Sequence, residues 1–126
     1  MKPVTHQSVR MEHMNNHGSL EAEYLAEWMI SAAYIGVVQV LGRKEHIVMC
    51  AVRELVFRNP VLLGAVLSLS YELVKTGTTS LTIAVEARDM LDPELVYGSC
   101  QVVFVNTDDS GKSAPHGITM ETEPEA

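Results

Sequence analysis

Two glutamates one helical turn apart, Glu23 and Glu27, are well placed in this sequence to do acid–base chemistry. A carboxylate can take a proton from water and so make water a useful nucleophile. The same spacing is also typical of a solvated helix surface, because both side chains lie opposite the apolar stripe of the predicted helix. The residues alone leave both interpretations open.

The histidines and cysteines give weaker signals. His13 and His17 are four residues apart, but they fall on either side of a predicted strand-to-turn boundary, so they lack the geometry of a helical metal-binding pair. Cys50 and Cys100 both lie in apolar, strand-like runs, which predicts buried and reduced thiols. We therefore expect no metal site.

The composition is typical of a soluble protein with one domain. The chain has 126 residues, of which 47% are hydrophobic and 20% are charged. Its net charge of -7 argues against a nucleic-acid partner, which would require a basic face. No apolar run reaches the roughly 18 residues that a membrane span needs. The first residues also lack the apolar segment of a signal peptide, so we expect a cytoplasmic protein without a membrane partner.

Hydrophobic periodicity predicts one long helix and several strands. The helix should span residues 20–41, with Ser19 as its N-cap and Gly42 as its stop signal. Its apolar stripe contains Leu25, Trp28, Met29, Ala32 and Gly36. Apolar or alternating segments predict strands over residues 9–13, 47–57, 65–75, 80–88 and 96–106. Short connections favour antiparallel neighbours, so the predicted fold class is α+β, with the helix wrapped by an antiparallel sheet.

The order of these elements and four short stretches resemble the hotdog-fold acyl-CoA thioesterases, particularly the bacterial acyl-CoA hydrolase branch. The four stretches are similar to that family's asparagine-x-x-glycine turn, mid-helix segment, phenylalanine–proline–glycine connection and glycine-x-threonine-serine turn. They comprise residues 15–20, 27–35, 57–64 and 76–81. The resemblance implies a hotdog domain over residues 1–112. The polar, acidic residues 113–126 predict a flexible tail.

The resemblance also implies a function. In that family a homodimer, which can assemble further into tetramers or hexamers, hydrolyses acyl-CoA or a related thioester between its subunits. Coenzyme A is then part of the substrate, and no separate cofactor is expected. Backbone N–H groups at the helix start would face the thioester carbonyl. By this resemblance Asn15 is an orienting amide and Gly18 is the glycine of the tight turn. Arg58 and Lys75, basic residues at a loop and a turn, are expected to contact the coenzyme A phosphates. With Gly18, the other expected substrate contacts are Glu23, Thr79 and Ser80.

This sequence departs from the family pattern at four positions. Most members carry an acid directly after the helix methionine, where this chain has Ile30. An isoleucine can neither accept a proton nor attack a carbonyl. Ala22 and Glu23 stand where the family has a pair of helix glycines. Ala65 stands where it has an acid after the connecting glycine, and Thr78 where it has a basic turn residue.

A second branch offers a substitute for the missing acid. The fluoroacetyl-CoA thioesterase type carries a glutamate–tryptophan pair in the helix with a threonine eight residues upstream, and this chain has Glu27-Trp28 with Ser19 eight residues before Glu27. The histidine that follows a valine–arginine pair in that branch is Glu54 here. We therefore expect Glu27 to be the catalytic carboxylate, assisted by Ser19 and Asn15.

Two other functions remain open. Ile30 favours a hotdog protein that binds acyl-CoA, or a similar small ligand, without hydrolysing it. A purely structural role in a larger hotdog assembly is the other alternative.

Overall fold

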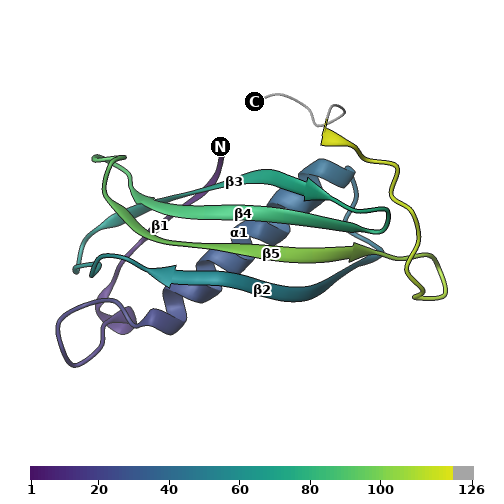
Figure 1. Cartoon of the computed structure of the whole chain (residues 1–126). Coiled ribbons are helices and arrows are strands. Elements are labelled where there is room, and N and C mark those ends of the chain that lie inside the picture. The colour runs from purple at the N-terminus through teal and green to yellow at the C-terminus, as the bar shows by residue number, and fades with distance from the viewer. Residues whose placement is uncertain (121–126) are drawn as a thin grey trace.

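One long helix packs against a five-stranded sheet in the computed structural model, which describes residues 1–120 of the chain (Figure 1). Within the described residues the single α-helix is α1 (Ala22–Leu41), and a short 3-10 helix, η1 (Met11–His13), precedes it. The strands are β1 (Lys2–Ser8), β2 (Ile47–Phe57), β3 (Val66–Thr76), β4 (Ser80–Asp89) and β5 (Val96–Asn106). The predicted class, a helix against an antiparallel sheet, is confirmed.

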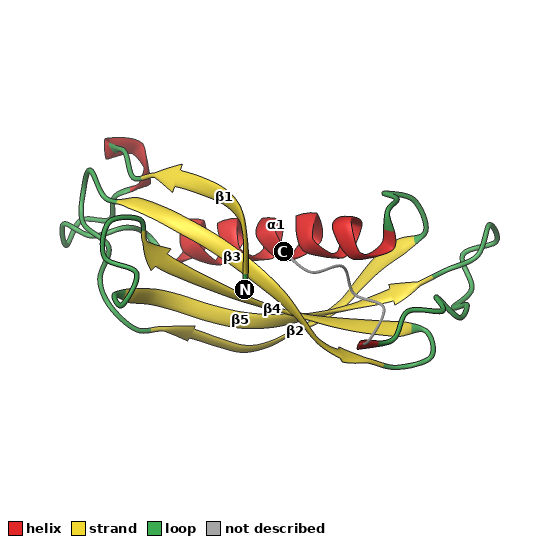
Figure 2. Ribbon diagram, turned by 90° about the horizontal axis from the view of Figure 1, so that it is seen from above, coloured by secondary structure: helices red, strands yellow, loops and turns green. Residues whose placement is uncertain are grey.

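The sheet is antiparallel throughout, with the order β1-β3-β4-β5-β2. The strand that directly follows α1, β2, pairs with the last strand, β5, so the sheet ends in β1 on one side and β2 on the other. Figure 2 shows the sheet curving around one side of α1. This curvature gives the sheet an inner face, which contacts the helix, and an outer face.

The core lies between α1 and the inner face of the sheet. The buried helix residues are Leu25, Met29, Ala32, Ala33, Gly36, Val37 and Val40. By length and composition α1 could also cross a membrane, but these side chains belong to the same buried cluster as Leu69, Tyr71 and Phe104 of the sheet. In the part of the chain that the structure describes, α1 is thus the core helix of the domain.

Two glycines allow the helix and the sheet to approach closely. A Cβ atom at Gly36 would lie 2.6 Å from the ring of Tyr71, so the helix backbone rests directly on that ring. A Cβ atom at Gly98 of β5 would lie 2.9 Å from the Val56 carbonyl oxygen and 3.3 Å from the side chains of Leu25 and Met29. A larger residue at either position would force the layers apart.

The sequence predicted β2 and β5 with their observed bounds, but the start of the chain differs. The strand predicted over residues 9–13 is wrong, because the edge strand is β1 and residues 11–13 form η1. The His13 ring closes this turn by accepting a hydrogen bond from the Arg10 amide at 3.0 Å. Ser19 is not the N-cap of α1, since the helix begins at Ala22 and Glu21 occupies the N-cap position.

The two cysteines lie in different environments, and both are free. Cys100 is buried, as predicted, and burial raises the pKa of its thiol to about 11. The prediction of burial is wrong for Cys50, which is exposed on the edge strand β2, where the pairing register shifts between Met49 and Ala51. β2 has a neighbouring strand, β5, on one side only, so an apolar run did not imply burial.

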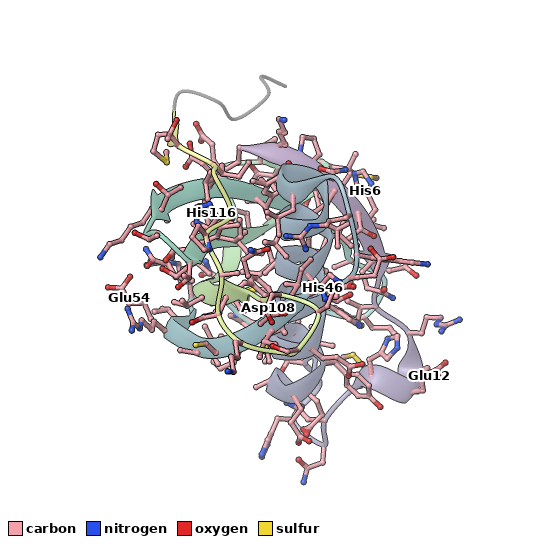
Figure 3. All side chains as sticks on the ribbon, turned by 90° about the vertical axis from the view of Figure 1, so that its right-hand side faces the viewer. His6, Glu12, His46, Glu54, Asp108 and His116 are labelled. Atoms are coloured by element: carbon pink, nitrogen blue, oxygen red, sulfur yellow. The ribbon has the colours of Figure 1, made fainter. Side chains whose placement is uncertain are left out.

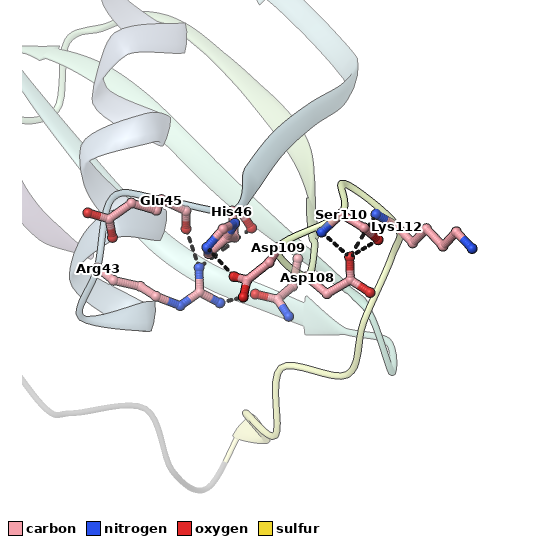
Figure 4. Close-up of polar contacts among 8 residues, drawn as sticks. Arg43, Glu45, His46, Asp108, Asp109, Ser110 and Lys112 are labelled. Carbon is pink, nitrogen blue, oxygen red and sulfur yellow. Dashed lines mark hydrogen bonds and ion pairs between the residues drawn. The ribbon is translucent and has the colours of Figure 1, made fainter.

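The segment that follows β5 is tied to the sheet through Asn106, which is only 5% exposed. Its side-chain nitrogen donates to the backbone carbonyls of Ala114 at 2.9 Å and Pro115 at 3.3 Å. Its side-chain oxygen accepts a hydrogen bond from Arg43. Figure 4 shows Arg43 beside His46, whose ring contacts Asp109 at 3.1 Å. Asn106 therefore joins the loop after α1 to residues 113–115.

The segment after Asn106 continues along the turn between β3 and β4. The His116 ring lies 2.8 Å from the Ser80 carbonyl oxygen, and its amide donates to the Thr78 carbonyl. Figure 3 views this end of the molecule, with His116, His46 and Asp108 labelled. Residues 113–119 of the predicted tail thus include several tethered positions, whereas residues 121–126 lie outside the described part.

We predict that Asn106→Leu lowers the free energy of unfolding by about 1–3 kcal/mol, because it leaves the carbonyls of Ala114 and Pro115 without their donor. Chemical denaturation measures this change. Hydrogen exchange should also speed up at the Ala114 and His116 amides. Asn16→Ala, at an exposed position of the 15–19 loop, is the control and should change neither quantity. Equal stability of the Asn106→Leu variant and the wild type would contradict this account.

Candidate active site

An apolar pocket of about 210 Å³ lies at the start of α1. The helix start, the end of β2 and the connection after β2 together form its wall. The lining residues are Leu20, Ala22, Leu25, Phe57, Arg58, Asn59, Pro60 and Val61. Arg58 is the one ionisable residue among them, and it is exposed.

Backbone hydrogen bonds hold the parts of this pocket together. The Leu20 amide donates to the Val61 carbonyl at 2.8 Å, which fixes the helix entry against the connection after β2. The Arg58 amide donates to the Tyr97 carbonyl at 2.9 Å, and the Asn59 side chain donates to the Val96 carbonyl at 2.7 Å. These bonds fasten the end of β2 to the start of β5, so the pocket is built on regular elements.

Tyr97 is itself held by a partly buried hydrogen bond. Its hydroxyl donates to Asp89 at 2.7 Å. Burial, and to a smaller extent the neighbouring Asp89 carboxylate, raises the pKa of Tyr97 to about 12. The same hydrogen bond lowers the pKa of Asp89. Tyr97 therefore stays neutral at physiological pH and acts as a rigid support behind the pocket.

Free backbone amides lie at the edge of the pocket. The amides of Tyr24 and Leu25 donate to the Glu21 carbonyl. The backbone N–H groups of Ala22 and Glu23 come just before them, and neither donates a hydrogen bond to any atom of residues 1–120. Such N–H groups carry partial positive charge and stabilise an oxyanion that forms beside them. A thioester carbonyl next to Ala22 would therefore meet hydrogen-bond donors.

The structure brings Asn15 and Ser19 together in the loop before the helix. The Asn15 amide nitrogen donates to the Ser19 hydroxyl at 3.0 Å, and its side-chain oxygen accepts from the amides of His17 at 2.8 Å and Ser19 at 3.1 Å. Gly18 has a φ of +83°, a conformation that suits a glycine in a tight turn. Asn15 thus shapes this loop and keeps one N–H for other contacts.

The two candidate carboxylates lie outside the pocket of their own copy. Glu23 and Glu27 are exposed, and neither lines the pocket at the helix start. Glu27 follows Leu25 by two positions, so its side chain leaves the helix about 200° around the axis from the pocket wall. A role in catalysis therefore requires Glu27 to meet a pocket on a second copy of the chain.

The remaining predicted contacts lie far from Arg58. Lys75, Thr79 and Ser80 lie in or beside the turn between β3 and β4, at the end of the sheet opposite to the end of β2 (Figure 1). The described residues of one copy bring only Arg58 to the pocket. A single ligand can touch both groups only if the turn belongs to another copy.

Edge strand β2 carries a large apolar surface. Its exposed apolar side chains, between 36% and 52% accessible, are Val48, Met49, Val52, Leu55, Val56 and Phe57. Phe57 also lines the pocket. Exposed apolar side chains concentrated on an edge strand indicate an interaction surface, and they lie directly beside the candidate site.

Sequence reasoning missed two parts of this region. One is the apolar wall of the pocket, although Leu25 was placed on the buried stripe. The other is an aromatic cluster in which the buried His13 ring lies 4.9 Å from Tyr24 and 5.0 Å from Trp28. The one-turn spacing of Tyr24 and Trp28 indicated their shared helix face, but nothing in the sequence connected His13 to them. No group of histidines, cysteines or acids within residues 1–120 could hold a metal ion.

Comparison with known proteins links this arrangement to solved structures. A hexameric hotdog-fold thioesterase from Campylobacter jejuni is similar over 96% of this chain and 92% of its own, with a TM-score of 0.79 and 22% identity. A hexameric thioesterase from Yersinia pestis is similar over 99% and 97%, with a TM-score of 0.79 and 20% identity. An acyl-CoA hydrolase from Staphylococcus aureus, solved with butyryl coenzyme A and coenzyme A, is similar over 88% and 66%, with a TM-score of 0.78 and 21% identity.

No protein-family model and no curated protein sequence matches the chain. The similarity to the solved structures covers nearly all of the sequence at low identity, so it establishes the architecture. The helix, the antiparallel sheet and these neighbours together show that the chain has the hotdog fold, as its sequence predicted.

Proposed function

We propose that this protein is an acyl-CoA thioesterase, which hydrolyses a thioester to a free acid and coenzyme A and works as a dimer or larger homo-oligomer. The observation that carries the proposal is the apolar pocket beside the free amides of Ala22 and Glu23. The apolar part suits an acyl chain, and the amides suit the carbonyl next to it. The fold shared with several solved thioesterases supports the same conclusion.

The proposed reaction uses water as the nucleophile. The Glu27 carboxylate takes a proton from a water molecule as the water oxygen attacks the thioester carbonyl carbon. The amides at the start of α1 stabilise the resulting oxyanion. The intermediate then collapses, the carbon–sulfur bond breaks, and the coenzyme A thiolate leaves and takes up a proton.

The second copy supplies what one copy lacks. Pairing along β2 would cover its exposed apolar side chains and extend the sheet across the two copies. It would also close the open side of the pocket near Phe57. We propose that Glu27, with Asn15 and Ser19, acts at the pocket of the partner, and that Arg58 contacts a coenzyme A phosphate.

Further contacts fit a larger assembly. Lys75, Thr79 and Ser80, together with Gly18 and Glu23, are proposed to contact the coenzyme A part from neighbouring copies. The hexameric state of two of the solved neighbours supports such an assembly.

We predict that Glu27→Gln lowers kcat/KM for acyl-CoA hydrolysis by about 10²–10⁴-fold, because the amide cannot take the proton from water. Colorimetric detection of released thiol measures this rate. Glu45→Gln, at an exposed position beyond α1, is the control and should leave the rate unchanged. Unchanged turnover in Glu27→Gln would remove Glu27 from the mechanism, whereas no hydrolysis by the wild type would contradict the proposed function.

We predict that Val52→Glu raises the dissociation constant of the dimer at least about 100-fold and lowers activity with it, because pairing would bury a charge beside β2. Sedimentation velocity gives the oligomeric state. Val74→Glu is a matched control, since Val74 is 37% exposed and Val52 is 36% exposed. Val74 lies on β3 and not on the proposed seam. A Val52→Glu variant that remains dimeric and active would show that β2 is not the seam.

The second candidate function is binding of acyl-CoA without hydrolysis. Ile30 occupies the position where the resembling family carries its acid, and Asn15 already spends most of its hydrogen-bonding capacity on its own loop. In this case Glu27 is a surface residue, and the pocket retains its ligand unchanged.

Ile30→Asp separates the two candidates. A carboxylate at this position should create or raise thiol release at least about tenfold if the site otherwise lacks a base. Ile30→Asn, which has nearly the same shape without the base, is the matched control. If the wild type already hydrolyses through Glu27, Ile30→Asp should bring little gain. The same thiol assay reads both outcomes.

A further inference from the structure

We infer that the pocket at the start of α1 limits its ligand to short, uncharged acyl groups of up to about six carbons. The coenzyme A part of that ligand rests on the proposed function. The chain-length limit rests on the shape of the pocket and on the two close contacts between the helix and the sheet.

The volume of the pocket sets the first limit. The volume is about 210 Å³, which is below the range of about 300–1,000 Å³ typical of sites for drug-sized ligands. A pocket of this size suits a short acyl group better than a long one.

Well-packed side chains close the inner end of the pocket. Leu20, Leu25 and Val61 line it and are only 7%, 3% and 2% exposed. Behind Leu25 the inaccessible Met29 packs against Gly98, where a Cβ atom would already lie within 3.3 Å of both side chains. Cores packed at this density leave no space for further methylene groups.

The path beneath the helix is closed as well. At Gly36 the helix backbone rests on the ring of Tyr71, and a Cβ atom there would lie 2.6 Å from a ring carbon. An acyl chain that passed Leu25 would have to separate these layers. A long chain therefore has no tunnel between α1 and the sheet.

The lining also selects against charge at the far end of the acyl group. Leu20, Leu25 and Val61 offer no hydrogen-bond partner from their side chains, and the exposed Arg58 is the one ionisable residue of the wall. A terminal carboxylate placed against the three buried side chains would lose its hydration without compensation. The pocket thus favours aliphatic over dicarboxylic acyl groups.

An acyl chain that instead ran along the seam between two copies would show a different dependence of affinity on its length. The exposed apolar side chains of β2 extend from Val48 to Phe57, so a ligand in the seam would gain contact with every added methylene. A ligand confined to the pocket gains contact only until the pocket is full. Affinity as a function of chain length distinguishes the two paths.

The test measures binding with S-alkyl coenzyme A thioethers, which cannot be hydrolysed, of two to twelve alkyl carbons. Calorimetry with the wild-type protein should show affinity rising about fourfold for each added methylene, the equivalent of about 0.8 kcal/mol, up to about six carbons and then levelling or falling. A ligand ending in a carboxylate should bind at least tenfold more weakly than its methyl-ended analogue. A parallel hydrolysis assay with the matching acyl-CoA series tests the proposed function separately.

Two variants should move the limit in opposite directions. Leu25→Ala opens the inner end, so the optimum should lengthen by about two carbons. Ala22→Leu fills the pocket from an exposed position that does not disturb the core, so the optimum should shorten by about two carbons. The matched controls are Leu73→Ala, a buried leucine outside the pocket, and Gln39→Leu, an exposed helix position, and neither should move the optimum.

The outcomes are separable. Affinity that continues to rise to twelve carbons, or an optimum that stays in place in both pocket variants, overturns the chain-length limit. If Leu25→Ala does not fold, Ala22→Leu alone still decides. The expected binding profile without thiol release supports the limit and rejects the thioesterase in favour of a binding protein.

Discussion

The close contact between α1 and the sheet is the constraint on which the rest of this structure depends. Gly36 lets the helix backbone rest on Tyr71, and Gly98 lets Leu25 and Met29 reach β5. Because these contacts fix the height of the helix above the sheet, they also fix where Leu20, just before the helix, meets the Val61 carbonyl. The free amides, the pocket and its closed inner end all follow from that placement.

The second organising feature is the incomplete edge at β2. A half-buried sheet normally protects its edges with charges, bulges or a covering element. β2 has bulges but also a row of exposed apolar side chains, and the pocket opens beside it. The proposed association would therefore serve stability and chemistry together, since the same contact would bury apolar surface and bring a carboxylate to the pocket.

The sequence predicted the parts of the fold that carry strong periodicity. Residues 47–57 and 96–106 are rich in valine and became β2 and β5 with the predicted bounds. β1 is short of apolar residues because it is an edge strand, so pattern reasoning placed the first strand on the turn around His13 instead. Asn15 and Ser19 were predicted as assisting residues, but their hydrogen bond to each other was not predicted. The proposed role of Glu27 rests on the family resemblance, because it depends on a second copy and not on the path of one chain.

Leu25 belongs to two functions at once, since it fills the core against Gly98 and forms the inner wall of the pocket. A change that enlarges the pocket at this position must remove atoms that also hold the helix in place. The size of the pocket and the stability of the fold are therefore coupled in this domain, and a larger pocket would require compensating changes elsewhere in the core.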